Sequence, residues 1–509
     1  MLVLDGRSLT IEDIVAVADG DESVDLAPAA VEAVSHSRAV VDEKALGDAP
    51  VYGINTGFGS FAEVKIPADF LDKLQINLLR SHAAGVGRPL PVRTVRAMLL
   101  LRANVLAKGF SGIRLETLRA LLALLDRRVH PLVPELGSVG ASGDLAPLAH
   151  LALVLVGEGE TWDGTSRRPG AEGLAAAGLE RVRLGPKEGL ALINGTQASA
   201  AVLALAVAGA IRLARAADIV ASMSVDALRG SARPFDPRIH AARPFAGQVS
   251  SAANISALLD GSTILASHQE GCVRVQDAYS MRCAAQVHGS AREGLAFARR
   301  IVETEANAAT DNPMVFAAEG DIVSGGNFHG APVALAADVL AIALAQLATI
   351  SERRIERLVN PMLSELPPFL TEQGGLESGL MLAQVTAAAL TSEMKGLAHP
   401  ASVDTIPTSA NKEDHVSMSM GAALKAERAL FLATRVLAVE LLAACQAIDL
   451  LAPLRTSPPL QLVHQRVRRD VGKLVEDRPP SPDIERIAQM IAGGEIEGCL
   501  DAASREKLS

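Results

Sequence analysis

The chain is predicted to turn from a loop into a helix along Gly137-Ser-Val-Gly-Ala-Ser-Gly-Asp-Leu-Ala-Pro-Leu-Ala-His150. Within this stretch, Ala141-Ser142-Gly143 sets a serine between two small residues. Because glycine has no Cβ, the Gly143 nitrogen can fold back onto the Ala141 carbonyl where a bulkier residue would clash. Closing that bond and losing two waters yields a five-membered ring, in which the Ser142 side chain becomes an exocyclic methylidene. The tripeptide can thus become an electrophile, but roughly one chain in five of this length contains Ala-Ser-Gly by chance.

Other interpretations of Ser142 fit less well. A hydrolase nucleophile elbow needs Gly-x-Ser-x-Gly, and Asp144 occupies the second glycine position. A phosphate-binding loop needs a lysine after its glycines, and none follows here. The remaining structural alternative is a glycine-rich turn in which Asp144 caps the helix that begins near Leu145. We expect that cap in either case, and a helix N-terminus beneath the tripeptide would direct its positive dipole at the Ala141 carbonyl.

The stretch resembles the signature of the histidine and phenylalanine ammonia-lyases, which convert Ala-Ser-Gly into 4-methylideneimidazol-5-one (MIO). Further segments match that family in the expected order: Val51-Tyr-Gly-Ile-Asn-Thr-Gly-Phe-Gly59, Ala191-Leu-Ile-Asn-Gly-Thr-Gln197, Val275-Gln-Asp-Ala-Tyr-Ser-Met-Arg-Cys283, Gly325-Gly-Asn-Phe-His-Gly330 and Ile406-Pro-Thr-Ser-Ala-Asn-Lys-Glu-Asp-His-Val416. Six ordered matches form a specific signal, whereas any one of them would be weak. The resemblance implies MIO built from Ala141-Ser142-Gly143, with no external cofactor and no metal, on an L-aspartase-like helical bundle.

Length and charge set the broad class. The 509 residues are ample for a large core and suggest two or three domains. Gly109-Phe-Ser-Gly112 is the best boundary, which predicts an N-terminal mixed region over 1–110, carrying Tyr52 and His82, and a helical-bundle domain over 111–509 with the MIO site. The net charge of −10 argues against nucleic acid. The cysteines show no paired spacing, which fits the reducing cytoplasm; they are Cys272, Cys283, Cys445 and Cys499.

Hydropathy predicts long buried helices. Three stretches are strongly apolar, namely Gly189–Ile211, Ala331–Ile350 and Ala429–Leu451, but each carries polar residues and much alanine. Buried helices of a soluble protein therefore fit better than membrane spans. Thr94–Ala107 is a further strong helix, and Trp162–Gly170 is predicted to form a hairpin or loop. Helices that are apolar nearly all round must be enclosed by other helices. We therefore expect a mainly α bundle and an oligomer. The resemblance implies that the oligomer is a homotetramer with shared active sites.

Tyrosine is rare enough to be informative. The chain has only Tyr52 and Tyr279, and each lies inside a matched segment. The structural alternative for each is a half-buried ring with a satisfied hydroxyl. Tyr52 lies among glycines, however, and such a loop suits closure over a ligand better than packing. By resemblance Tyr52 is the base at the substrate β-carbon, a task that requires a lowered pKa, and Tyr279 is catalytic as well.

A second group of residues is implied by the resemblance. Gln276, Tyr279 and Arg282 are spaced i, i+3 and i+6, so on a helix they would share one face; the alternative is a solvated amphipathic face. Arg282 matches the arginine that binds the substrate carboxylate, a task suited to guanidinium. Asn194 matches an asparagine that contacts substrate and prosthetic group, and Phe328 matches the phenylalanine beside the MIO ring.

The substrate is expected to be L-histidine, deaminated to urocanate in histidine degradation. Ser81-His82 resembles the histidine-specific pattern, and His82 and Glu413 together can hydrogen-bond both imidazole nitrogens. A benzene ring would leave those groups unpaired. Several positions depart from the family pattern: Lys412, Ala278, Val385 and Met394. An aromatic ammonia-lyase or a 2,3-aminomutase with the same prosthetic group is the alternative within enzymes, and a non-catalytic helical scaffold is the alternative outside them.

Overall fold

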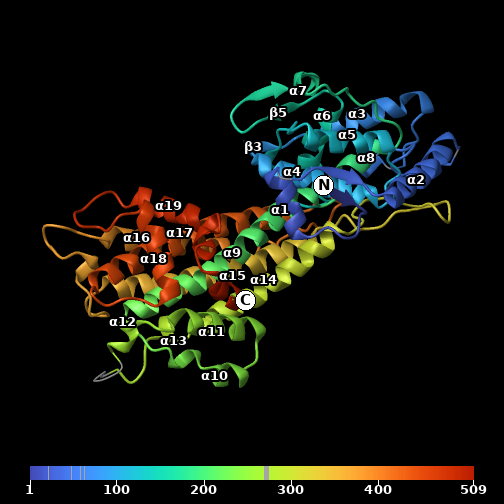
Figure 1. Cartoon of the computed structure of the whole chain (residues 1–509). Coiled ribbons are helices and arrows are strands. Elements are labelled where there is room, and N and C mark those ends of the chain that lie inside the picture. The colour runs from blue at the N-terminus through green and yellow to red at the C-terminus, as the bar shows by residue number, and fades with distance from the viewer. Residues whose placement is uncertain (21, 48, 58, 62, 269–273, 509) are drawn as a thin grey trace. The chain divides into compact units, whose positions relative to one another are not determined.

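The computed structural model describes residues 1–20, 22–47, 49–57, 59–61, 63–268 and 274–508. In these ranges the chain is mostly helical, with short strands paired into two-stranded sheets (Figure 1). Two compact units are each assembled from three separate segments. Unit 1 comprises Met1–Ala208, Arg299–Asp338 and Pro400–Leu424, and unit 2 comprises Gly209–Ala298, Val339–His399 and Lys425–Ser509. The predicted boundary at residues 109–112 lies within unit 1, and the division into 1–110 and 111–509 stays a prediction.

Unit 1 is the mixed part of the chain. Its helices are α1 (Ile11–Asp19), α2 (Pro28–Leu46), α3 (Leu71–His82), α4 (Val92–Ala107), α5 (Leu115–Asp126), α6 (Leu145–Leu155), α7 (Gly170–Ala176), α8 (Glu188–Ile193) and the start of α9 (Gln197–Ala227). β1 (Leu2–Leu4) pairs in parallel with β2 (Val24–Leu26). The antiparallel pairs are β3 (Val86–Pro89) with β4 (Pro134–Leu136), β5 (Glu160–Trp162) with β6 (Arg167–Pro169), and β7 (Met314–Phe316) with β8 (Asp321–Val323). The β5–β6 pair confirms the predicted hairpin.

Helix α4 forms the centre of unit 1. Every residue from Thr94 to Ala107 is buried, and α1, α2 and α5 pack against it. The predicted helix over Thr94–Ala107 is confirmed, beginning at Val92, and Gly109 follows it with a positive φ of 76°. Because α4 is buried on all sides, any polar residue along it must find its partners inside the core.

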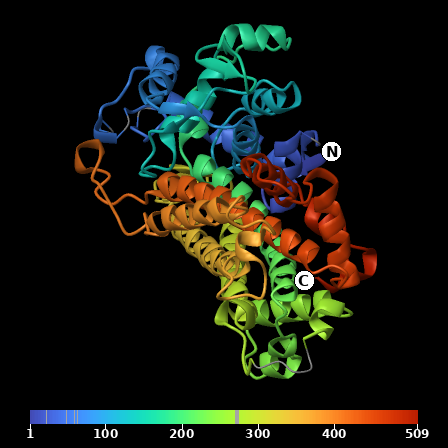
Figure 2. The ribbon, with the colours of Figure 1, turned by 90° about the vertical axis from the view of Figure 1, so that its left-hand side faces the viewer.

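Unit 2 contains the larger part of the bundle. After α9 come α10 (Pro237–Ala241), α11 (Ala246–Leu259), α12 (Thr263–Ala266), α13 (Tyr279–Arg282), α14 (Ala284–Ala306), α15 (Ala331–Val359), α16 (Met381–Leu397) and α17 (Ser419–Leu450). The C-terminal helices are α18 (Pro458–Asp470), α19 (Ser481–Ala492), α20 (Glu495–Gly498) and α21 (Ala502–Lys507). Helices α15 and α17 lie side by side in both ribbon views (Figures 1 and 2), where the fully buried Arg354 donates two hydrogen bonds to Glu440.

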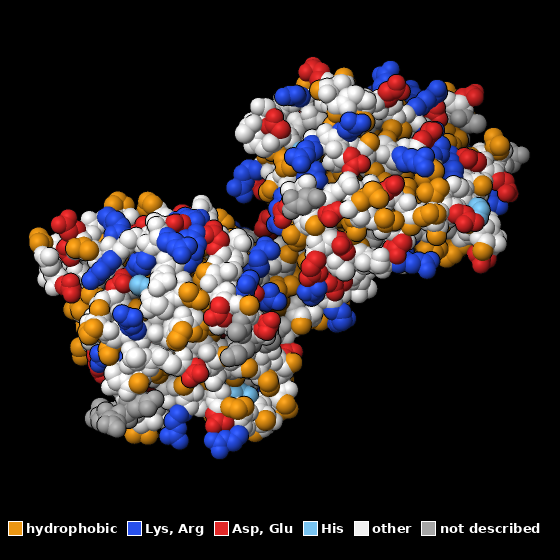
Figure 3. All heavy atoms as spheres, viewed as in Figure 1, with side chains coloured by type: hydrophobic (Ala, Val, Ile, Leu, Met, Phe, Trp, Pro, Cys, Tyr) orange, Lys and Arg blue, Asp and Glu red, His pale blue; other side chains and the backbone are white. Residues whose placement is uncertain are grey.

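The long helices behave as core elements. Helices α9, α15 and α17 are long and apolar enough to cross a membrane by length and composition, yet most of each apolar window is buried inside the structure. They also carry buried polar groups that have partners. Ser224 of α9 donates to Glu440 of α17, and Asp218 of α9 accepts from His288 and Arg292 of α14. This agrees with the prediction of buried helices. On the face drawn in Figure 3, basic side chains are interspersed with acidic ones.

Candidate active site

The Ala141-Ser142-Gly143 loop is held against a second backbone segment. Gly143 forms a parallel bridge with Gly195, and the Asp144 N–H donates to the Gly195 carbonyl at 2.7 Å. A Cβ on Gly143 would clash with the Gly195 backbone, and its φ of +70° is also unfavourable for residues with a side chain. Only glycine therefore fits at residue 143.

The other side of the loop is fixed by residues more than 270 positions later in the chain. The Met418 N–H donates to the Val139 carbonyl at 2.8 Å, and the Ser417 hydroxyl donates to the Gly140 carbonyl at 2.9 Å. A Cβ on Gly140 would clash with the Ser417 and Ser419 hydroxyls. The tripeptide is thus fixed by neighbours on both of its flanks, immediately before α6 begins at Leu145.

Asp144 does not cap α6, which corrects the sequence-based prediction. It occupies the N-cap position, but its side chain makes no capping hydrogen bond there. Its buried carboxylate instead accepts from the Ser138 hydroxyl at 2.8 Å and from the N–H and hydroxyl of Ser199, each at 2.8 Å. Asp144 therefore caps the first turn of α9, a helix that begins about fifty residues later. Burial raises the pKa of its carboxyl, although these hydrogen bonds oppose the shift.

Asn194 faces Ser142. Its amide nitrogen donates to the Asn312 carbonyl at 2.9 Å, which leaves its side-chain oxygen 3.4 Å from the Ser142 hydroxyl oxygen. The structure therefore brings together Asn194 and the tripeptide, as the resemblance implied. Asn312 and Ser417 were not singled out from the sequence. Ser417 directly follows the matched segment that ends at Val416, so a longer match would have included it.

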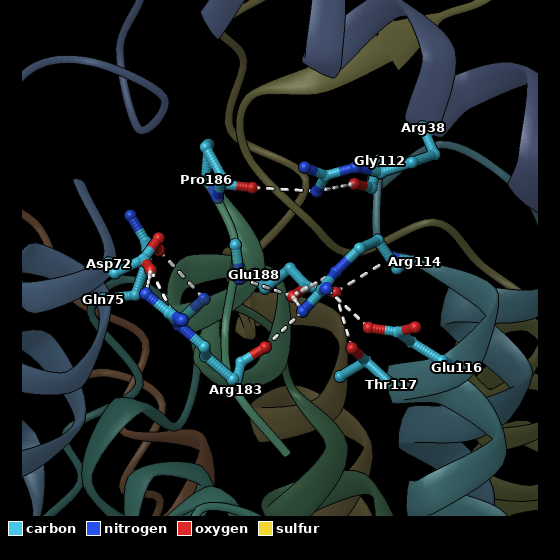
Figure 4. Close-up of polar contacts among 12 residues, drawn as sticks. Arg38, Asp72, Gln75, Gly112, Arg114, Glu116, Thr117, Arg183, Pro186 and Glu188 are labelled. Atoms are coloured by element: carbon cyan, nitrogen blue, oxygen red, sulfur yellow. Dashed lines mark hydrogen bonds and ion pairs between the residues drawn. The ribbon is translucent and has the colours of Figure 1, made fainter. Parts of the chain in front are cut away.

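The short helix α8, which precedes Asn194, is anchored by a buried carboxylate (Figure 4). The fully buried Glu188 accepts from the Arg114 N–H at 3.0 Å, the Thr117 hydroxyl at 2.7 Å and the Gly185 N–H at 2.7 Å, and it forms an ion pair with the Arg114 guanidinium. The next residue, Gly189, donates to the Gln75 side-chain oxygen at 2.9 Å. These bonds fix the helix from which Asn194 projects.

Tyr52 and His82 are both half-buried in unit 1. The Gly59 N–H lies 3.5 Å from the Tyr52 hydroxyl oxygen. Burial raises the pKa of Tyr52, and the negative charge of Glu413 raises it further. This is opposite to the lowered pKa that a tyrosine base requires. His82 Nδ1 lies 2.9 Å from the Leu78 carbonyl oxygen, and burial lowers the pKa of His82.

Glu413 lies close enough to influence the pKa of both Tyr52 and His82. Its carboxylate accepts from the Thr408 hydroxyl at 2.6 Å and the Ser409 hydroxyl at 2.8 Å. Segments distant in the chain thus converge in unit 1. The half-buried Phe328 belongs there too: its neighbour His329 stacks on His415, with ring centroids 5.8 Å apart and planes at 1°.

The remaining predicted residues lie in unit 2, and one expectation about them is wrong. Helix α13 spans only Tyr279–Arg282, because Ala278 is extended (φ −63°, ψ 157°). Gln276 therefore precedes the helix, and the three side chains do not share one helical face. The Arg282 guanidinium lies 4.7 Å from the centroid of the Tyr279 ring, a cation–π geometry, and its Nε donates to the Asp277 carbonyl at 2.9 Å.

Comparison with known proteins identifies the family. The model of the family described as "Aromatic amino acid lyase" matches residues 9–469. The chain belongs to this family. A curated protein named "Histidine ammonia-lyase" from Anaeromyxobacter dehalogenans is 58% identical over 504 residues, covering 97% of this chain and 99% of that protein. A lyase of this family breaks a carbon–nitrogen bond of an amino acid, so the chain is a carbon–nitrogen lyase.

Solved structures of the family have the same fold. Histidine ammonia-lyase from Trypanosoma cruzi is 45% identical with a TM-score of 0.90, covering 99% of this chain and 96% of that one. Tyrosine aminomutase from Streptomyces globisporus is 38% identical with a TM-score of 0.93, covering 98% of each chain. The predicted mainly α, L-aspartase-like fold is confirmed.

Proposed function

We propose that this chain is a cytoplasmic histidine ammonia-lyase, which removes ammonia from L-histidine without oxidation and releases urocanate, the first step of histidine degradation. The observation that carries the proposal is the fixed tripeptide, with the Asn194 side-chain oxygen 3.4 Å from the Ser142 hydroxyl. The names of curated relatives at high identity and over nearly the full length support the same reaction.

The residues around the tripeptide fit MIO as its prosthetic group. Ala141 and Gly143 are small, Gly143 has room for no side chain, and both flanks are fixed by hydrogen bonds. This supports formation of MIO from Ala141-Ser142-Gly143, and the proposal includes no external cofactor and no metal. Once formed, MIO supplies an electrophilic carbon that makes the substrate amino group a better leaving group.

The chain's own residues then bind the substrate and move the proton. His82 and Glu413 hydrogen-bond the two imidazole nitrogens, with Glu413 held in place by Thr408 and Ser409. Tyr52 removes the β-proton as its phenolate, so a nearby cation must lower the pKa that burial raises in the single chain. Asn194 contacts the substrate and Phe328 packs beside the ring.

The other proposed site residues lie in unit 2. Arg282 binds the substrate carboxylate through its two terminal nitrogens, because its Nε already donates to the Asp277 carbonyl. Tyr279 acts beside it and Gln276 binds substrate. Tyr279 is 70% exposed and Val275 is 96% exposed. A large exposed aromatic next to an exposed valine supports burial against another copy, and we propose a homotetramer whose pockets are shared between chains.

The proposal is tested by incubating purified protein with histidine, phenylalanine and tyrosine in turn and recording the absorbance of the conjugated acrylate. We expect urocanate from histidine as the fastest product. A preference for phenylalanine or tyrosine would favour an aromatic ammonia-lyase, and a β-amino acid product would favour an aminomutase. The structural match to a tyrosine aminomutase makes the last outcome the second candidate. The absence of any product would indicate a scaffold.

A further inference from the structure

One arginine is enclosed in the core beside the Asn194–Gly195 segment. Arg102 lies on α4, has no exposed surface, and donates from one terminal nitrogen to the Asn194 carbonyl at 2.8 Å and to the Gln197 side-chain oxygen at 2.5 Å. Among the described residues, its Nε and second terminal nitrogen have no hydrogen-bond partner. A guanidinium with five donors and so few acceptors is an expensive core residue.

The side chains around Gly195 are packed closely. The Gln197 amide nitrogen donates to the Thr310 hydroxyl at 2.7 Å, so the amide oxygen faces Arg102. A Cβ on Gly195 would lie 2.6 Å from an Arg102 nitrogen and 2.8 Å from the Thr310 hydroxyl. Arg102, Gln197 and Thr310 therefore pack closely against Gly195, whose carbonyl accepts the Asp144 N–H.

Stability does not explain this arginine. Burial lowers the pKa of Arg102 to about 10, so the group remains protonated at neutral pH, and Asp311 is the charge that opposes this shift. Asp311 already forms an ion pair with the buried Lys187 at 3.1 Å. Burying a charge this deeply costs free energy of desolvation, so the burial of Arg102 is weak evidence for a stabilising role. The arginine is better explained by what it does to the Asn194–Gly195 backbone.

We propose that Arg102 is a positioning residue for ring closure at Ala141-Ser142-Gly143, acting through the Asn194 carbonyl and the Gly195 backbone. This inference rests on the proposed function. In the closure, the Gly143 nitrogen bonds to the Ala141 carbonyl carbon, and that carbonyl oxygen leaves as water with the amide protons of Gly143 and Ser142. The Ser142 hydroxyl leaves as the second water with the Cα proton. No oxidant is needed, so correct placement of the two backbone atoms is what the protein must supply.

The test compares two arginines of the same helix. Arg96 is also buried on α4 and also donates to backbone carbonyls, those of Val17 at 2.9 Å and Leu125 at 3.1 Å, but it does not contact Asn194 or Gln197. Arg96→Met is therefore the control for Arg102→Met. The readouts are the mass of the peptide spanning residues 141–143, the ultraviolet absorbance of MIO, and the melting temperature of each purified protein.

We expect the wild type and Arg96→Met to give a peptide lighter by two waters, with Arg96→Met losing melting temperature only. Arg102→Met should lower the matured fraction by about tenfold or more, and Arg102→Lys should restore most of it by keeping a charged donor. Full maturation in folded Arg102→Met, with unchanged kcat on histidine, would overturn the inference. If Arg102→Met does not fold, Arg102→Gln decides, because its shorter and uncharged side chain also removes the guanidinium: full maturation there overturns the inference equally. An unmodified peptide in active wild type would instead overturn the proposed prosthetic group.

Discussion

The Ser142 hydroxyl oxygen lies 3.4 Å from the side-chain oxygen of Asn194, and the amide nitrogen of Asn194 is committed to the Asn312 carbonyl. The asparagine is therefore fixed in one orientation and can offer Ser142 only an acceptor. A hydroxyl that donates to a fixed acceptor has a defined direction. The serine side chain is thus oriented before any chemistry at the tripeptide begins.

Ser142 supplies the methylidene carbon in the proposed prosthetic group, so Ser142→Ala should abolish activity. Folding should be intact, because Ser142 is only half-buried and alanine is smaller. Activity on histidine and circular dichroism measure the two parts of this prediction. An active Ser142→Ala protein would contradict it.

Gly195→Ala should destabilise the protein and impair maturation. The added Cβ would lie 2.6 Å from a nitrogen of the buried Arg102, and overpacking of this kind costs about 1–3 kcal/mol. Gly164→Ala is the matched control: that glycine also has a positive φ, +100°, but nothing lies within 4 Å of its Cβ position. Thermal unfolding and peptide mass should separate the two variants, and equal effects would show that backbone strain alone matters.

The titration of Tyr52 should respond to Glu413. Burial and the Glu413 charge both raise the pKa of Tyr52, so in the single chain the phenol stays neutral at neutral pH and ionises only as the pH rises. Glu413→Gln removes the negative charge and should move that titration to lower pH. Because the chain has only two tyrosines, phenolate absorbance in a Ser142→Ala, Tyr279→Phe background reports Tyr52 alone.

Glu393→Gln is the matched control for that titration, since Glu393 pairs with Arg428 and its charge is not among the causes of the Tyr52 pKa shift. It should leave the Tyr52 titration unchanged. If the Tyr52 titration in Glu413→Gln is unchanged or moves to higher pH, the electrostatic contact between Glu413 and Tyr52 is refuted.

Substrate choice should depend on His82 and Glu413. His82→Leu or Glu413→Gln should cost about 1–3 kcal/mol of transition-state stabilisation on histidine for each lost hydrogen bond to a buried partner. Any residual turnover of phenylalanine should fall far less, because its ring makes neither bond. Lys412→Gln should leave histidine turnover similar or improved. The measurement is kcat/KM on histidine and on phenylalanine. Equal losses on both substrates would show that His82 and Glu413 support protein stability and not substrate choice.

Assembly should be required for activity. The exposed Tyr279 and Val275 lie in the segment that carries Arg282, and we expect another copy to cover them. Sedimentation should show a tetramer at working concentrations, and Tyr279→Glu should weaken it by placing a charge in the interface. A fully active monomer would rule out shared sites.

Local features were predictable from the sequence. The helix that follows the tripeptide and the helix that ends at Ala107 depend on residues within a few positions of each other, and both are found where expected. The segments that converge on the site in unit 1 were recognised through family resemblance and not through any local pattern. Gly143 and Gly195 lie in two of these segments, and the absence of a Cβ at both residues explains why the two backbone segments can come into contact.

Partners distant in the chain were not predictable. The spacing favoured Asp144 as a cap for α6, but its carboxylate accepts from Ser199, whose proximity only the tertiary fold creates. Arg102 lies in a largely apolar helix, and no local pattern indicates that it binds the Asn194 carbonyl. Likewise the spacing of Gln276, Tyr279 and Arg282 could not reveal that the extended backbone at Ala278 delays the helix.

The order in which the chain is synthesised gives the late segment of unit 1 a further role. Residues 137–143 leave the ribosome long before Ser417 and Met418, whose hydrogen bonds to Gly140 and Val139 complete the surroundings of the tripeptide. A nascent or truncated chain therefore lacks one of the two supports of the loop. Under the proposed function, ring closure at the tripeptide would therefore wait until nearly the whole polypeptide exists, and an unfinished chain would carry no electrophile.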